Sequence, residues 1–215
     1  MKEKYNILFF VDVHSSKSAL KSIMIKAKKA DLVVCLGDFT FFGNDLDKIA
    51  KKLNSIKKPV LMIAGNHEYP EEIDELCKKY KNLISLEDDF YEYDNLIFYG
   101  DSEGGFSFHD PELEQRISKI KKRVHMFKKK HENARIIFCF HSPPYGTVLD
   151  KMSNSTHVGS KTKSKLIKII KPTVVVSGHI HETKYKKQIK LKTFFLNPGP
   201  DARFIKFDKE NFKNN

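Results

Sequence analysis

Five short apolar runs in this chain each end at a cluster of polar residues of the types that bind metal ions. The runs read LFFV, LVVCL, VLMIA, IIFCF and VVVS. In the same order, the clusters that follow them are Asp12-Val13-His14, Gly37-Asp38, Gly65-Asn66-His67-Glu68, His141 and Gly178-His179-Ile180-His181. Short runs rich in Val, Ile, Leu and Phe are typical of buried strands. Because open α/β sheets place their sites at the carboxyl ends of strands, we expect the clusters to meet.

The chain alternates between such runs and amphipathic segments over most of its length. We expect strands at 5–11, 32–36, 60–64, 96–99, 135–140 and 173–177, and helices at 17–29, 45–54, 71–80, 111–131 and 160–170. This alternation implies crossover connections and a largely parallel sheet. After it, 184–190, 193–196 and 203–207 are predicted to be short antiparallel strands. A chain of 215 residues with 40% hydrophobic residues suits one domain, so we expect a single α/β domain over residues 1–215.

Composition argues against several classes of protein. The apolar runs are too short to cross a bilayer, so no membrane-spanning helix is expected. The three cysteines form no CxxC motif, and no signal-peptide cleavage site follows the first apolar run, which favours a cytoplasmic location. The net charge of +12 comes mostly from lysine and predicts a solvated basic surface. Because no motif that reads RNA or DNA is present, a nucleic-acid partner is possible but not favoured.

The clusters contain seven side chains that can bind a metal ion. They are Asp12, His14, Asp38, Asn66, His141, His179 and His181. Seven donors exceed what one tetrahedral zinc needs and suit two metal ions that share a carboxylate. Oxygen and imidazole donors without thiolate favour Mn, Fe, Zn, Co or Ni over Ca or Mg alone. In extended backbone, residues two apart point to the same side, so each His-containing pair would offer two ligands to one region.

The ordered set D-x-H, G-D, G-N-H, H and G-H-x-H resembles the motifs of the calcineurin-like metallophosphoesterases. In this sequence the set spans residues 12–181. The segments His141-Ser142-Pro143-Pro144 and His157-Val158-Gly159-Ser160 are similar to segments of the small, compact phosphoesterases of archaeal and bacterial type. The resemblance implies a four-layer sandwich of two mixed β-sheets flanked by helices.

The resemblance also implies a role for each motif residue. Asp12, His14 and His181 would hold one metal ion, Asn66, His141 and His179 would hold the second, and Asp38 would bridge both. A hydroxide between the metals would attack phosphorus, so that Asp38 also counts as a catalytic residue. His67 would not be a ligand and would protonate the leaving group or stabilise its charge, roles that suit a histidine. Manganese is the metal that we favour.

The sequence departs from the protein Ser/Thr phosphatases of this superfamily at one position. Those enzymes have an Asp-Arg pair soon after the G-D motif, whereas residues 39–45 here read FTFFGND. Without an arginine that grips phosphate with two hydrogen bonds, a small or nucleotide-like phosphodiester is favoured over a phosphoprotein. A nuclease, a phosphomonoesterase and a non-catalytic protein-binding scaffold are the alternatives.

Several questions are left open by the sequence. They are the natural substrate, the preference for diesters or monoesters, the metal present in the cell, the oligomeric state, and the role of His157 and the 142–159 loop. Gly104-Gly105 is interpreted as a turn, with close approach of the backbone to a phosphate as the alternative.

Overall fold

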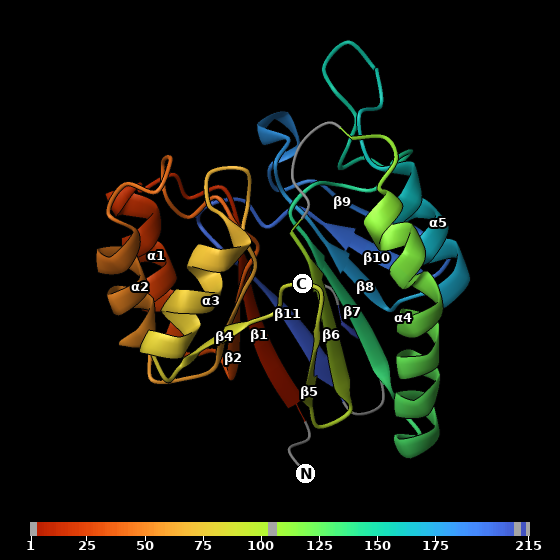
Figure 1. Ribbon diagram of the computed structural model, residues 1–215, viewed down its shortest axis with the longest axis horizontal. Coiled ribbons are helices and arrows are strands. Elements are labelled where there is room, and N and C mark those ends of the chain that lie inside the picture. Colours follow the sequence, from red (N-terminus) through yellow and green to blue (C-terminus); the bar gives the residue numbers. More distant parts are fainter. Residues whose placement is uncertain (1–3, 103–106, 209–211, 214–215) are drawn as a thin grey trace.

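The computed structural model describes residues 4–102, 107–208 and 212–213, and these form four layers (Figure 1). Two sheets of six strands each pack face to face in the middle. Helices α1 (Lys17–Ala27), α2 (Leu46–Asn54) and α3 (Pro70–Lys79) cover the outer face of one sheet. Helices α4 (Pro111–Lys130) and α5 (Lys161–Ile170) cover the outer face of the other. The expected sandwich of two mixed sheets flanked by helices is therefore confirmed.

The first sheet has the order β12-β11-β1-β2-β3-β4. Its strands are β12 (Phe212–Lys213), β11 (Arg203–Asp208), β1 (Lys4–Phe10), β2 (Leu32–Cys35), β3 (Val60–Met62) and β4 (Leu83–Ser85). Strands β1 to β4 are parallel to one another. Strand β11 runs antiparallel to β1, with Ile7 opposite Ile205. The parallel arrangement brings the carboxyl ends of β1, β2 and β3 to one edge of the sheet.

The second sheet has the order β5-β6-β7-β8-β10-β9. Its strands are β5 (Phe90–Tyr93), β6 (Leu96–Asp101), β7 (Arg135–Phe140), β8 (Val174–Val176), β10 (Thr193–Leu196) and β9 (Lys187–Lys190). Strands β6, β7, β8 and β10 are parallel to one another. Strand β5 pairs antiparallel with β6 at one edge of the sheet, and β9 pairs antiparallel with β10 at the other. The carboxyl ends of β7 and β8 thus also lie side by side.

The predictions of individual strands were partly wrong. Strand β10 is parallel to β8, although residues 193–196 were expected to pair only antiparallel. The short strands β4, β5 and β12 were not predicted, and β9 begins at Lys187 rather than at residue 184. Strand β11 returns to the first sheet, whereas β9 and β10 belong to the second. Such pairings join segments far apart in sequence, so local alternation does not encode them.

The inner strands β1, β2, β3, β6, β7 and β8 are largely buried on both faces, which explains why their sequences are almost continuously apolar. In β1, Leu8 and Phe10 pack in the core beneath the helices of the first sheet. Ile7 and Phe9 point the other way, into the core between the two sheets. Because successive side chains of a strand alternate between faces, one apolar run serves two cores. Polar side chains are excluded from both faces and gather where the strands end.

Two further expectations concern the chain as a whole. Among the residues that the structure describes, none of the helices combines the length and the apolar composition needed to cross a membrane. The single domain over residues 1–215 and the cytoplasmic location stay predictions.

Candidate metal centre

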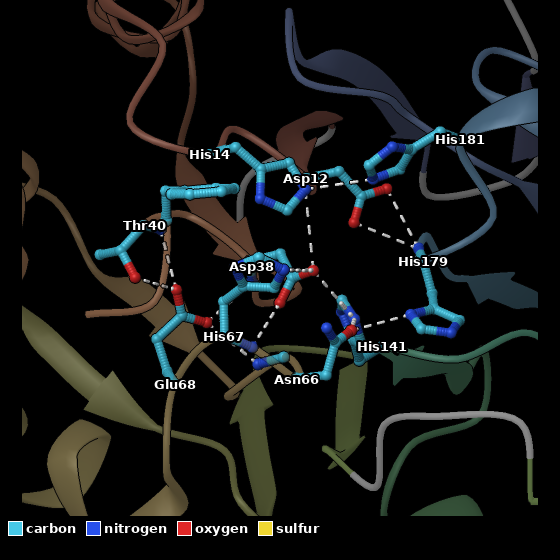
Figure 2. Close-up of polar contacts among 12 residues, drawn as sticks. Asp12, His14, Asp38, Thr40, Asn66, His67, Glu68, His141, His179 and His181 are labelled. Atoms are coloured by element: carbon cyan, nitrogen blue, oxygen red, sulfur yellow. Dashed lines mark hydrogen bonds and ion pairs between the residues drawn. The ribbon is translucent and has the colours of Figure 1, made fainter. Parts of the chain in front are cut away.

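The polar clusters at the ends of β1, β2, β3, β7 and β8 converge around the carboxylate of Asp38 (Figure 2). Its Oδ2 atom lies 3.7 Å from His14 Nε2 and 3.5 Å from His141 Nε2. The same oxygen lies 4.0 Å from Nε2 of His67. Its Oδ1 atom accepts a hydrogen bond of 3.0 Å from the backbone N–H of His67. One oxygen of Asp38 is therefore fixed by the backbone, while the other faces three imidazole rings.

In the part of the chain that the structure describes, three groups of metal-binding side chains lie at this centre, and two of them consist entirely of expected ligands. Within each of these two groups the ligand atoms lie within 4.8 Å of one another: Asp12, His14 and His181 in one group, and Asp38, His141 and His179 in the other. Asn66 extends the second group, since its Oδ1 lies 2.9 Å from His179 Nδ1 and 3.0 Å from His141 Nε2. All seven predicted donors are thus close together, and their role as metal ligands stays a prediction.

The surroundings of His141 fit a ring that binds a cation. The ring is fully buried, and its Nδ1–H donates to the carbonyl oxygen of Leu36 at 2.8 Å. Burial lowers the pKa of His141 to about 3, so the ring is neutral and Nε2 carries a lone pair. That lone pair faces the oxygens of Asn66 and Asp38. Acceptors that face one another repel, and a cation held between them removes the repulsion.

His14 and His181 show the same pattern in the other group. Their Nε2 atoms lie 3.1 Å apart. Burial lowers the pKa of both rings, that of His14 to about 4. Two neutral rings that meet through Nε2 share at most one proton, so at least one lone pair is available to a metal ion.

The two aspartates of the centre are poorly solvated. Burial raises the pKa of Asp12 to about 7 and that of Asp38 to about 8. Asp12 also accepts hydrogen bonds of 3.2 and 3.0 Å from the backbone N–H of His179, which favour its charged form. A divalent cation beside these carboxylates would outweigh the loss of hydration and keep both ionised at neutral pH. The donor set therefore fits two divalent ions.

The backbone at the centre is strained rather than extended. The φ angles of Asp12, His14, Asp38 and His179 are 55°, 45°, 50° and 66°. These values lie in the left-handed region, which non-glycine residues seldom adopt. His181 begins a short 3-10 helix, η1 (His181–Thr183). The expectation that extended backbone aligns Asp12 with His14 and His179 with His181 was therefore wrong; sharp turns after the strands bring these residues together.

Two glycines permit the close packing of these turns. A Cβ atom at Gly65 would lie 2.1 Å from Oδ1 and 2.5 Å from the backbone nitrogen of Asp38. A Cβ atom at Gly178 would lie 2.8 Å from Oδ2 of Asp12. Any side chain at these positions would displace a carboxylate of the centre.

His67 presents a hydrogen-bond donor to the centre. Its Nδ1 accepts a hydrogen bond of 3.1 Å from the backbone N–H of Phe42. In a neutral imidazole only one nitrogen carries hydrogen, so the proton lies on Nε2, the nitrogen that faces Asp38. A protonated Nε2 has no lone pair for a metal ion. This geometry supports the expectation that His67 is not a ligand, although His14, Asp38 and His67 also form a cluster of metal-binding groups.

Glu68 is a residue of the centre to which the sequence analysis assigned no role. Its carboxylate is 5% exposed and accepts backbone hydrogen bonds from Asp38 at 2.8 Å and from Gly65 at 3.1 Å. It also accepts from the backbone N–H of Thr40 at 2.8 Å and from its hydroxyl at 2.6 Å. Glu68 thereby ties the turn after β2 to the turn after β3. The sequence signal that could have identified Glu68 is its position directly after Gly65-Asn66-His67.

The sequence analysis also missed a buried ion pair next to the segment that carries His141. Nζ of Lys163 lies 3.0 Å from Oδ2 of Asp101, and the side chains are 1% and 0% exposed. Lys163 also donates a hydrogen bond of 2.7 Å to the hydroxyl of Ser142, the residue after His141. The pair fixes the segment that carries His141. A lysine on a helix of a lysine-rich chain is expected on the surface, so no local signal pointed to this pair.

His157 lies outside the two groups of donors. Its Nδ1 is 2.8 Å from Oδ1 of the buried Asp150, and its ring lies 5.6 Å from that of Tyr145. Asp150 also accepts hydrogen bonds from the backbone N–H of Gly146 and Gly159, which fixes the 142–159 loop. The contact between His157 and Asp150 therefore helps to hold the 142–159 loop in its conformation. Gly104-Gly105 lies outside the described residues.

Comparisons with known proteins agree with this geometry. The model of the calcineurin-like phosphoesterase family matches residues 5–183. The uncharacterized protein MJ1162 of Methanocaldococcus jannaschii is 30% identical over 191 residues, which are 85% of this chain and 83% of that protein. The structure of TT1561 of Thermus thermophilus superposes with a TM-score of 0.71 at 15% identity, covering 95% of this chain and 99% of the other. A dimetal phosphatase from Danio rerio gives 0.60 at 14% identity, covering 94% and 91%. At these identities the two structures establish the shared fold only.

Proposed function

Because this chain belongs to the calcineurin-like phosphoesterase family, we propose that it hydrolyses phosphodiester bonds of a small or nucleotide-like substrate with the aid of two divalent metal ions. Asp12, His14 and His181 would hold one ion, Asn66, His141 and His179 the other, and Asp38 would contribute to both. The observation that carries this proposal is the position of Asp38 Oδ2, within 4.0 Å of ring nitrogens from three of the converging turns.

The chemistry divides between the metal ions and the protein. Two divalent ions, when bound, would activate a water molecule and neutralise the charge of the phosphoryl group. His67 would donate a hydrogen bond from Nε2–H to the leaving oxygen and stabilise the charge that develops there, and its Nδ1 contact with Phe42 holds the ring in the tautomer that this requires. A hydrogen-bond donor aimed at developing charge contributes roughly 10²–10³-fold to a rate. Glu68 would hold the Asp38 turn in place through its backbone hydrogen bonds.

The preference for a diester follows from what surrounds His67. The turn after Asp38 contributes Phe41 and Phe42, with no arginine in residues 39–45. A phosphomonoester dianion carries a second charge that favours such a guanidinium grip. A diester carries a single charge and has two organic groups, one of which would face the aromatic side chains. Manganese is the metal we propose among those that suit mixed oxygen and imidazole donors.

The test compares wild-type protein with Asp38→Asn on bis-p-nitrophenyl phosphate and p-nitrophenyl phosphate, each with Mn²⁺, Zn²⁺, Ni²⁺, Co²⁺ or Fe²⁺. We expect faster turnover of the diester, loss of turnover in Asp38→Asn, and two equivalents of metal in the purified wild type. Asp74→Asn, on the exposed face of α3, is the matched control and should keep full activity.

Each alternative predicts a different outcome of the same experiment. Faster turnover of the monoester would establish a phosphomonoesterase. Hydrolysis of polynucleotides with a steep dependence on salt, and none of small diesters, would establish a nuclease. If the purified protein neither turns over any ester nor contains bound metal, the alternative of a non-catalytic protein-binding scaffold would be supported.

A further inference from the structure

Two phenylalanine side chains beside His67 are exposed to solvent. Phe41 is 51% exposed and Phe42 is 67% exposed, high values for such apolar groups. The ring of Phe42 lies 4.1 Å from that of His67, at an angle of 33°. The ring of Phe41 lies 5.0 Å from that of Phe42 in an edge-to-face arrangement and 5.4 Å from that of His67. The two side chains form one aromatic surface at the edge of the metal centre, which we call the Phe41–Phe42 platform.

The backbone that carries this platform is held firmly. Phe42 has a φ angle of 50°, a strained value for a bulky residue. The backbone N–H of Phe41 donates to the hydroxyl of Ser15, at 3.2 Å, and Thr40 is held by Glu68. The backbone N–H of Asn44 closes the turn on the carbonyl oxygen of Phe41, at 3.2 Å. The turn is thereby fastened to the segments after β1 and β3. Strain kept in place by so many contacts points to a function for the exposed rings.

The position of the platform indicates which part of a substrate it would meet. His67 points its Nε2 towards Asp38 and contacts Phe42 through the other edge of the ring. An oxygen that is stabilised by Nε2–H must lie within hydrogen-bond distance of it. The atoms bonded to the leaving oxygen would therefore extend beside His67, next to the exposed rings.

We propose that the Phe41–Phe42 platform binds the leaving group of the substrate by stacking, and that it selects phosphoesters whose leaving group carries a planar aromatic ring. The proposal rests on the function proposed above, because it takes His67 as the group that contacts the leaving oxygen. A phenyl group and a nucleobase share the chemistry that such a surface recognises. Stacking of a base on an aromatic side chain contributes about 1–3 kcal/mol, which corresponds to roughly 5- to 150-fold in affinity.

The first measurement is binding, which does not depend on turnover. Isothermal titration calorimetry of the Mn²⁺-loaded protein would compare the monomethyl esters of benzylphosphonate and cyclohexylmethylphosphonate, whose rings have similar size but differ in planarity. We expect wild type to bind the benzyl compound at least about fivefold more tightly, in line with one stacking interaction. Phe42→Leu keeps an apolar side chain without the ring and should lose this preference, whereas Phe42→Tyr should retain it.

The second measurement is kcat/KM for methyl phenyl phosphate and methyl hexafluoroisopropyl phosphate, whose leaving alcohols are similar in acidity. Phe42→Leu should lower kcat/KM for the phenyl ester about fivefold or more and leave the alkyl ester within about twofold. Ile25→Ala, at an exposed position of α1, is the control and should change neither. In the binding measurement, the monomethyl ester of thymidine 5′-phosphate would then be compared with the benzyl compound to distinguish a nucleoside from a phenyl group.

The outcomes separate this proposal from the proposed function. Equal binding of the benzyl and cyclohexylmethyl compounds by wild type would overturn the platform, whatever the activity. An equal fall of kcat/KM for both esters in Phe42→Leu would also overturn it, because Phe42 would then act only by positioning His67. A retained benzyl preference in a protein that turns over no ester would refute the proposed function and leave the platform as a binding site.

Discussion

The carboxylate of Glu68 accepts a hydrogen bond of 2.8 Å from the backbone N–H of Asp38, the residue at the middle of the candidate metal centre. Three further donors from Thr40 and Gly65 complete the shell of Glu68. All four donors come from the turns that carry Asp38, Asn66 and His67. The shape of the centre therefore depends on a side chain that is not among the candidate metal ligands.

Replacing Glu68 should weaken both the fold and the centre. In Glu68→Gln one carboxylate oxygen becomes an amino group that faces N–H donors, which leaves at least one buried donor without an acceptor. We expect the free energy of unfolding to fall by about 2–3 kcal/mol, measured by urea denaturation. Glu112→Gln is the control, because its side chain is 81% exposed, and should change stability by less than about 0.5 kcal/mol. Equal stability of the two variants would contradict the assigned role.

The buried lysine behind His141 gives a second prediction with a control on the same helix. Lys163→Met removes a cation that is 1% exposed; among the described residues, the ion pair that the carboxylate of Asp101 then keeps is the one with Arg116, at 3.2 Å. We expect a loss of about 3–5 kcal/mol in the free energy of unfolding. Lys165→Met breaks a pair whose side chains are 57% and 44% exposed and should cost less than about 1 kcal/mol. Similar losses in both variants would show that burial of Lys163 is not what matters.

The assignment of His67 as the hydrogen-bond donor to the leaving oxygen predicts a dependence on the leaving group. His67→Ala removes the Nε2–H donor and should lower kcat by roughly 10²–10³-fold for a methyl phenyl diester, whose phenolate leaving group needs its charge stabilised. For bis-p-nitrophenyl phosphate the loss should be much smaller, because p-nitrophenolate spreads its charge onto the nitro group. Steady-state kinetics on both esters measures the ratio. His125→Ala, at an exposed position of α4, should behave as wild type. The same loss on both esters would point to a structural role of His67.

The raised pKa of Asp38, about 8 in the folded protein, predicts how metal-free protein responds to pH. Its ordinary value is 3.8, so above this value the folded state holds a proton that the unfolded state has released. Stability therefore falls as pH rises towards 8. Between pH 7 and 9 we expect the Tm of EDTA-treated wild type to fall about 2–4 °C more than that of Asp38→Asn.

The histidines of the centre act in the opposite direction and at lower pH. The pKa values of His14 and His179 are about 4, below the ordinary 6.5, so their contribution is present above pH 6.5 and lost as pH falls towards 4. This window lies below the one used for Asp38 and does not disturb that comparison. A parallel fall of Tm in wild type and Asp38→Asn from pH 7 to 9 would refute the raised pKa of Asp38.

The close approach at Gly65 predicts a severe effect of one methyl group. In Gly65→Ala the new Cβ would lie 2.1 Å from Oδ1 of Asp38, so the carboxylate must move. We expect less than one equivalent of bound Mn²⁺ after dialysis, measured by atomic emission. Gly146→Ala is the control, because a Cβ there meets nothing within 4 Å and the strain of its φ angle of 78° is local. Full metal content in Gly65→Ala would show that the turn adapts.

The chemistry of the candidate centre could be predicted from the sequence because its signals are local. An apolar run predicts a buried strand, and the residues after it lie at the strand's end. Asp12, Asp38 and His141 were therefore expected to lie near one another before any long-range contact was known. The number of donors led to the expectation of two metal ions, and the order of the motifs indicated the fold.

Only the tertiary structure decided how these residues are held. The parallel pairing of β10 with β8, the left-handed turns at Asp12 and His179, and the burial of Lys163 all depend on segments far apart in the chain. So do the hydrogen bonds that Glu68 receives and the contact that fixes the proton of His67. Local patterns fix which face of an element is apolar. They do not fix its neighbours, because pairing and side-chain orientation are set by packing the whole chain at once.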